Sequence, residues 1–195
     1  EYFGKYGCVL CISSSGDVFS FGTQPDCAHG HEQHKIIHPT KVSSLQYIRS
    51  IDCGGDHTIC IDFNGSVYSF GSNKFGQLGI GLEEEDLDFT HIPQKINLPP
   101  IKQISCGDRF SLCLCERGNL YSFGYNGDGQ LGNGSFINCN SPFKLEAFIN
   151  CDSAIDFIES GHDFSFCKLE NNDVYFWGCN DALRIDIFYY PSGDC

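Results

Sequence analysis

The chain has 195 residues, of which 41% are hydrophobic and 19% charged, a composition typical of a globular protein with a sizeable core. Its formal net charge is −13. A surface this acidic repels phosphate backbones and anionic lipid headgroups, so we expect no direct nucleic-acid or membrane partner. The sequence contains no methionine, so we expect it to be a processed product or a piece of a longer protein.

A seven-residue pattern that ends in an aromatic residue and a glycine occurs four times and is the strongest signal in the chain. Its copies are residues 16–22 (GDVFSFG), 65–71 (GSVYSFG), 118–124 (GNLYSFG) and 172–178 (NDVYFWG). Successive copies therefore start 49, 53 and 54 residues apart. Four cysteines follow the same spacing, which indicates small buried residues of a repeated strand: Cys11, Cys60, Cys113 and Cys167.

The second copy, taken in chain order, predicts four short strands. Residues 48–53 form the first candidate, and the β-branched run 58–61 forms the second. Asn64 and Gly65 supply a tight hairpin turn. Residues 66–70 return from it, and residues 94–98 form the fourth candidate.

About four antiparallel strands per repeat, with weak helix signals, predict an all-β fold built of propeller blades. We divide the chain into one propeller segment, 1–195, with repeats of about 1–50, 51–103, 104–157 and a truncated 158–195. The aromatic pair of each copy, such as Tyr68 and Phe70, is expected to pack one blade against the next.

Three motifs of the second copy resemble the regulator of chromosome condensation repeat: Gly-Gly-Asp-His-Thr (54–58), Asn-Gly-Ser-Val-Tyr-Ser-Phe-Gly (64–71) and Asn-Lys-Phe-Gly-Gln-Leu-Gly (73–79). The resemblance implies a seven-bladed ring, so four copies would be a fragment or an incomplete propeller. Residues 24–30 of the first copy and 180–184 of the fourth lack the third motif. The repeat glycines are Gly54, Gly65, Gly71, Gly107, Gly118, Gly124, Gly161 and Gly178.

The resemblance also implies that the Gly-x-x-His turns lie on one face of the ring, next to its axis. Members that act on the small GTPase Ran use acidic and histidine residues of such turns. The partner-binding candidates here are Asp56, His57, Asp108, Arg109, His162 and Asp163. The competing interpretation is that these side chains bond the turn backbone, and it applies most to His57.

Enzymatic chemistry finds little support. The sequence has no nucleophile elbow and no phosphate-binding loop, so we expect neither catalysis nor a cofactor. The family resemblance also extends to a tryptophan-based light receptor whose turns carry Trp and Arg. No turn here carries Trp, and Trp177 falls in a strand, so light sensing is not expected.

A histidine-rich segment offers a metal site as an alternative. Its candidate ligands are Cys27, His29, His31 and His34. Closed metal sites usually draw their ligands from two separate segments, so we favour a polar connecting loop. The number of cysteines, thirteen, is odd, and four of them follow the repeat, which favours reduced thiols and therefore the cytoplasm or nucleus.

The expected function is non-catalytic binding of another protein by a propeller that belongs to a larger chain. One alternative is a guanine nucleotide exchange factor for a Ran-like small GTPase. Another is the substrate-recognition propeller of a ubiquitin ligase or kinase.

Overall fold

The computed structural model describes residues 2–3, 7–23, 29–33, 35–81, 87–148, 153–180 and 183–190, and every regular element among them is a strand. The first two sheets contain β1 (Tyr2–Phe3), β2 (Cys8–Ile12), β3 (Val18–Thr23), β4 (Lys35–Lys41), β5 (Ile48–Cys53), β6 (His57–Asp62), β7 (Val67–Ser72) and β8 (Phe89–Lys95). The last two contain β9 (Ile101–Cys106), β10 (Phe110–Cys115), β11 (Leu120–Gly124), β12 (Cys139–Lys144), β13 (Ile155–Ser160), β14 (Phe164–Leu169), β15 (Val174–Asn180) and β16 (Leu183–Tyr190).

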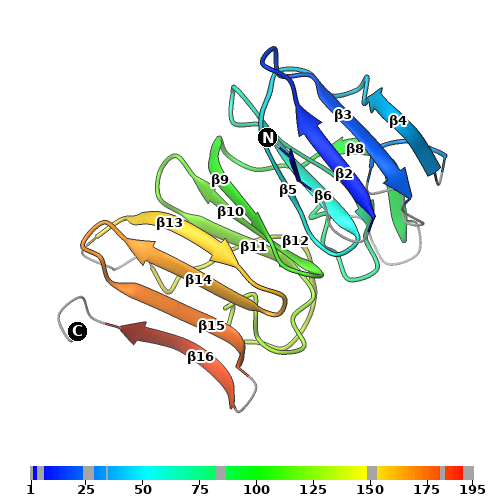
Figure 1. Ribbon diagram of the computed structural model, residues 1–195. Coiled ribbons are helices and arrows are strands. Elements are labelled where there is room, and N and C mark those ends of the chain that lie inside the picture. Colours follow the sequence, from blue (N-terminus) through cyan, green and yellow to red (C-terminus); the bar gives the residue numbers. More distant parts are fainter. Residues whose placement is uncertain are drawn as a thin grey trace.

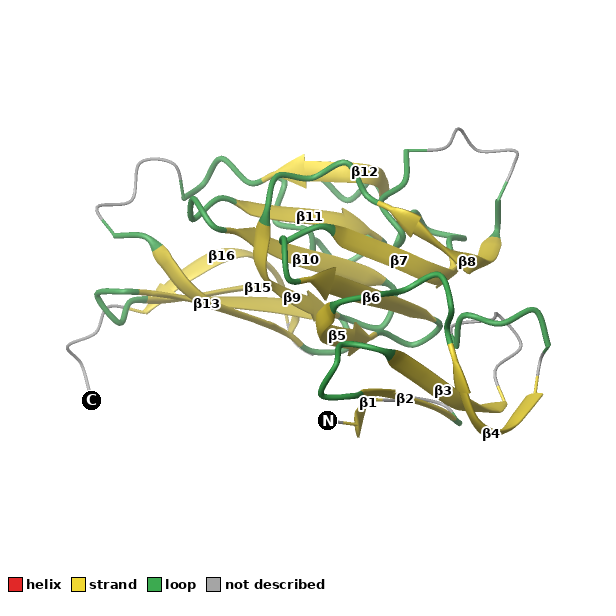
Figure 2. Cartoon of the chain, turned by 90° about the horizontal axis from the view of Figure 1, so that it is seen from above, coloured by secondary structure: helices red, strands yellow, loops and turns green. Residues whose placement is uncertain are grey.

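Each group of four strands forms one antiparallel sheet in chain order, which confirms the predicted blades. The sheets follow one another along an arc (Figure 1), with β5, β9 and β13 as neighbouring inner strands. Seen from above, the first and fourth sheets lie at opposite ends of the molecule, with the second and third between them (Figure 2). Within the described residues, no helix is long and apolar enough to span a bilayer.

The outer strand of the second sheet differs from the prediction. It spans β8, Phe89–Lys95, rather than residues 94–98. Pro93 lies inside this strand, which is tolerated because β8 is the edge of its sheet. Ile96 has already left the strand, and its amide donates to the Val67 carbonyl while its side chain is buried. The fourth repeat, expected to be truncated, contributes a sheet of four strands.

The core lies between the sheets rather than inside any one of them. We call the side of a sheet that faces the next sheet in the chain its forward face, and the opposite side its back face. Between the second and third sheets, Ile59 and Ile61 of the forward face pack on Ile104, Cys113 and Phe123 of the back face. The other two junctions are likewise built of aliphatic, cysteine and aromatic side chains.

The aromatic pairs of the second, third and fourth repeats pack as predicted, whereas Phe19 and Phe21 of the first repeat are partly exposed. Phe70, Phe123 and Trp177 are fully buried, each in the junction with the preceding sheet. Their partners Tyr68, Tyr121 and Tyr175 are partly buried against the same three clusters. The equivalent residues of successive repeats therefore occupy the same surroundings.

The repeat cysteines behave as small hydrophobic residues. Cys60, Cys113 and Cys167 are inaccessible to solvent. Burial raises the pKa of the Cys60 and Cys113 thiols well above the ordinary value, so both are protonated at neutral pH. Cys11, on the back face of the first sheet, is partly exposed because no described sheet covers that face.

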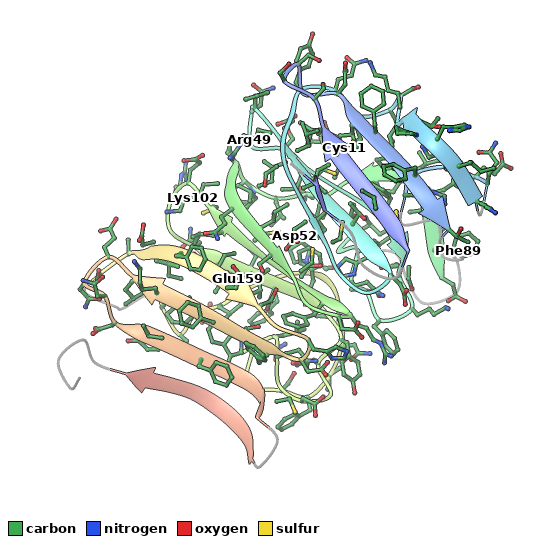
Figure 3. All side chains as sticks on the ribbon, in the orientation of Figure 1. Cys11, Arg49, Asp52, Phe89, Lys102 and Glu159 are labelled. Atoms are coloured by element: carbon green, nitrogen blue, oxygen red, sulfur yellow. The ribbon has the colours of Figure 1, made fainter. Side chains whose placement is uncertain are left out.

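Side chains of the inner strands tie neighbouring sheets together (Figure 3). Arg49 donates to the Ile101 carbonyl at 2.7 Å and to the Lys102 carbonyl at 3.3 Å. Lys102 in turn donates to the Ile155 carbonyl at 3.2 Å. Asp156 occupies the equivalent place in the fourth sheet and pairs with Lys168 of its own sheet instead. The series of cationic contacts therefore ends at β13.

Replacing Leu112 with alanine tests the junction. Leu112 is 0% exposed and belongs to the cluster that joins the third and fourth sheets. We expect Leu112→Ala to lower the free energy of unfolding by about 2–5 kcal/mol, because a buried cavity replaces the side chain. The single tryptophan, Trp177, lies in the same cluster, so its fluorescence during urea unfolding provides the measurement.

The matched control is Ile137→Ala, at a side chain that is 76% exposed. We expect this control to change stability by no more than about 0.5 kcal/mol. Equal losses for the two variants would contradict a core located between the sheets.

Candidate functional site

Three equivalent turns join the inner strand of a sheet to the next strand. They span Gly54–His57, Gly107–Phe110 and Gly161–Phe164, and in each the first amide donates to the carbonyl of the fourth residue. The ring of that fourth residue lies against the first glycine, where a Cβ atom would collide with it. This contact explains why glycine recurs at the position, whether the fourth residue is His or Phe.

Main-chain hydrogen bonds connect one turn to the next. The Gly55 amide donates to the Asp108 carbonyl at 2.8 Å, and the Asp108 amide donates to the His162 carbonyl at 2.9 Å. The three turns therefore form one continuous rim. We call the surface that carries them the turn face, and the opposite ends of the sheets, which carry the β6–β7, β10–β11 and β14–β15 hairpins, the hairpin face.

His57 supports the rim from inside. Its side chain is 0% exposed, and Nε2 lies 2.9 Å from the Ser111 hydroxyl oxygen of the third sheet. The Ser111 hydroxyl donates its proton to the Gln77 carbonyl, so His57 Nε2 is the donor to Ser111. A serine–histidine pair with this proton arrangement, sealed from solvent, does not generate a nucleophile.

The charged candidates gather where the second and third turns meet. The Asp108 side chain is 10% exposed, and its Oδ2 lies 3.2 Å from Arg109 Nε and 3.6 Å from His162 Nε2. His162 also pairs through Nδ1 with Asp163. Asp56 contributes its carbonyl to the Ser72 amide and is partly buried. Arg109 and His162, at 49% and 65% exposed, project furthest from the rim.

Two aromatic residues that sequence reasoning missed lie beside Arg109. The guanidinium carbon of Arg109 is 5.2 Å from the centre of the Phe75 ring. Tyr125 packs edge-on against Phe75, with ring centres 5.2 Å apart and an angle of 72° between the rings. Phe75 belongs to the second repeat, and its contact with the third depends on the stacking of two sheets.

The Gly-Gln-Leu-Gly element of the repeat locks these turns to the sheets. In the second repeat, the Gln77 and Leu78 carbonyls accept the hydroxyl groups of Ser111 and Ser69. In the third repeat, the Gln130 and Leu131 carbonyls accept the hydroxyl groups of Ser165 and Ser122 in the same way. Each Gln carbonyl thus bonds a serine of the following sheet, and each Leu carbonyl a serine of its own sheet.

His29 takes the place of this leucine in the first repeat. Its carbonyl accepts the Ser20 hydroxyl at 2.6 Å, and its side chain is fully buried. The histidine-rich segment therefore continues the repeat at this point, although it was interpreted as a connecting loop outside it. Gly30 follows His29 and packs against Val42 and Phe70, as a repeat glycine does.

The remaining metal candidates do not assemble into a site within the described residues, where no three metal-ligating side chains converge. His31 lies 5.7 Å from His29 between ring centres. Burial lowers the pKa of His31, a hydrogen bond with the Thr40 backbone opposes this shift, and nearby His91 adds to it. Cys27 and His34 lie outside the described residues.

Carboxylates line the inner strands near the turn face (Figure 3). The Asp52 carboxylate accepts the Cys53 amide at 2.8 Å and, across the junction, the Cys106 amide at 2.7 Å. Glu159 of β13 lies within electrostatic reach of Asp52. Desolvation, and then the charge of Asp52, raise the pKa of Glu159 above its ordinary value.

Comparison with known proteins identifies the same repeat three times. The family described as "Regulator of chromosome condensation (RCC1) repeat" matches residues 15–61, 64–114 and 117–167. The chain is 37% identical over 170 residues to "Ultraviolet-B receptor UVR8" of Arabidopsis thaliana, covering 84% of this chain and 38% of the relative. It is 38% identical over 188 residues to "Protein RCC2" of Homo sapiens, covering 91% and 35%.

Solved structures show the same fold. The crystal structure of human WBSCR16 superposes with a TM-score of 0.84 at 23% identity, over 97% of this chain and 53% of that one. Prp20p of Saccharomyces cerevisiae, whose structure was described with its binding properties to Gsp1p and histones, superposes with a TM-score of 0.79 at 24% identity, over 91% and 44%. The chain spans little more than a third of the length of UVR8 and of human RCC2.

Two histidine substitutions distinguish a residue that supports the rim from one that is merely exposed on it. We expect His57→Ala to lower the free energy of unfolding by about 2–4 kcal/mol, because it opens a cavity and removes the bond to Ser111. His162→Ala, at an exposed side chain, should cost less than about 1 kcal/mol. Chemical denaturation of both variants provides the measurement, and a similar loss for the two would contradict the buried role of His57.

The raised pKa of Glu159 predicts that Glu159→Gln stabilises the folded protein by an amount that depends on pH. A carboxyl group whose pKa is raised on folding favours the protonated native state, so the native protein loses stability as pH rises through that pKa. We therefore expect Glu159→Gln to raise the urea midpoint at pH 7, and this gain to shrink as the pH falls toward 4. Glu116→Gln, on the exposed β10–β11 hairpin, is the control; an equal gain there would show a general charge effect.

Proposed function

This chain belongs to the regulator of chromosome condensation repeat family, and on that premise we propose that it is a non-catalytic propeller segment that binds another protein through its turn face. The observation that carries the proposal is the rim of three turns joined by main-chain hydrogen bonds. A rim held in this way presents its side chains at fixed spacing before a partner arrives. Less conformational freedom is then lost on binding, which favours affinity.

The side chains on the rim suit recognition of a protein rather than catalysis. Arg109, His162 and Asp163 are at least partly exposed and bear hydrogen-bonding groups. The serine–histidine pair beneath them is inaccessible to a substrate. The ten cysteines of the described residues are free thiols, which supports a cytoplasmic or nuclear location.

The second candidate function is nucleotide exchange on a Ran-like small GTPase. It is supported by the Prp20p structure, described with its binding properties to Gsp1p, and by the acidic and histidine residues of the turns. His57 contributes to this candidate only indirectly, because it is buried. A substrate-recognition role in a ubiquitin ligase or kinase would use the same face without nucleotide release.

Site-specific cross-linking tests the binding face. A photoreactive amino acid replaces His162 on the turn face in the full-length protein, and a second variant carries it at Glu170 on the hairpin face. We expect the His162 position to cross-link to a discrete partner protein in cells and the Glu170 position to do so at least fivefold less. Stronger capture from Glu170 would overturn the proposed face.

Nucleotide release distinguishes the two functions. A purified Ran-type GTPase loaded with fluorescent GDP is mixed with the full-length protein, and fluorescence is followed over time. If the chain acts by binding alone, release proceeds at the intrinsic rate whether or not the two proteins associate. Acceleration of tenfold or more would establish exchange, and Asp108→Asn would then test the turn face in the same assay.

A further inference from the structure

Arg109 differs from the other rim residues because packing holds its side chain in place. On one side its guanidinium lies over the Phe75 ring, and Phe75 is itself braced by Tyr125. On the other side, Nε pairs with the nearly buried carboxylate of Asp108. Asp108 is fixed in turn, since its amide and carbonyl bond the two neighbouring turns.

The outer edge of the guanidinium remains available. The ion pair with Asp108 is made through Nε, and the side chain is 49% exposed. An arginine that is oriented in advance and half exposed is suited to bidentate contact with an oxyanion. Arginine and aromatic residues are also the types that contribute most at protein interfaces.

This arrangement occurs at one junction among the described turns. At the equivalent place in the next repeat, Asp163 stands for Arg109, Asp128 for Phe75 and Cys179 for Tyr125. The three substitutions together remove the cation, the ring beneath it and the ring that braces it. The group is therefore a local feature added to the repeat and not a requirement of the fold.

The surrounding charges select among anions. Asp108 neutralises part of the Arg109 charge, and Asp163 lies on the adjacent turn beside His162. A singly charged carboxylate at the guanidinium is repelled less by these groups than a doubly charged phosphate is. The net charge of −13 acts in the same direction.

We infer that Arg109, positioned by Phe75, Tyr125 and Asp108, binds a carboxylate side chain, Asp or Glu, on the surface of the partner protein. The inference rests on the proposed function, since it places a protein on the turn face. Arg109 is the contacting residue, and the two aromatic residues act through its orientation.

Acetate is the probe that tests the chemistry without knowledge of the partner. In the full-length protein, the guanidinium NMR signals of arginine are followed during titration with sodium acetate at constant ionic strength maintained with chloride. We expect the Arg109 signal, identified by its loss in Arg109→Lys, to shift saturably. Half-saturation should occur at an acetate concentration at least threefold below that for Arg117, an exposed arginine of the β10–β11 hairpin.

Phe75→Leu separates orientation from simple exposure of a cation. The leucine retains bulk but removes the ring, so half-saturation at Arg109 should rise at least threefold while the amide spectrum remains native. An unchanged titration in Phe75→Leu, equal responses of Arg109 and Arg117, or tighter binding of inorganic phosphate than of acetate would each overturn the inference.

The cross-linking experiment and the acetate titration can fail independently of each other. Acetate binding without a captured partner at position 162 would leave the anion site standing and refute the proposed face for protein binding. Capture of a partner without selective acetate binding would support the proposed face and refute the anion site. When a partner is captured, charge-neutralising substitutions of its acidic residues should weaken binding to the wild type at least fivefold and to Arg109→Lys by less than twofold.

Discussion

The contact between the forward face of one sheet and the back face of the next governs the rest of this structure. A four-stranded sheet has two faces, and burial of both requires a neighbour on each side. Aliphatic residues of the forward face, such as Ile59, meet an inner-strand isoleucine and an aromatic residue of the next sheet. Removal of apolar surface from water drives this stacking, and the sequence repeat places equivalent residues in each junction.

Polar contacts give the apolar junction its register. The Ser111 and Ser165 hydroxyls reach back to the Gln77 and Gln130 carbonyls of the preceding sheet, and Arg49 crosses the junction at the inner strands. Each bond satisfies a backbone carbonyl near the core, where an unpaired one would be costly. Apolar packing alone tolerates sliding between faces, whereas these directional contacts specify one alignment. The positions of the three turns, and hence of the rim, follow from that alignment.

Much of the fold could be predicted from the sequence because one repeat specifies one sheet. Three features recur at fixed spacing: the aromatic pairs, the hairpin at Asn64 and the buried cysteines. Side chains that recur in this way indicate which positions of a strand are buried. The outer strand β8 was misplaced because an edge strand carries a weak pattern and tolerates Pro93. His29 was read as part of a loop because a histidine in a leucine position hides the repeat.

The charged rim was only partly predictable, for a geometrical reason. The turns that contain Asp108 and His162 were found through the motif they share. The placement of Phe75 under Arg109 joins residues of different repeats, and no spacing within one repeat contains that information. The burial of His57 likewise depends on the third sheet, which supplies Ser111 and covers the imidazole.

The bonds between successive turns use only main-chain atoms, namely the Gly55 and Asp108 amides and the carbonyls they reach. Main-chain hydrogen bonds therefore carry most of the rim's connectivity, to which the side chains add the Asp108–His162 pair. Mutation at an exposed third position, such as Arg109, changes what the surface recognises while the scaffold beneath it persists, whereas a side chain at Gly55 would collide with Asp108. A gene family that duplicates such a unit acquires a surface open to rapid divergence, with each new specificity arising at little cost to folding.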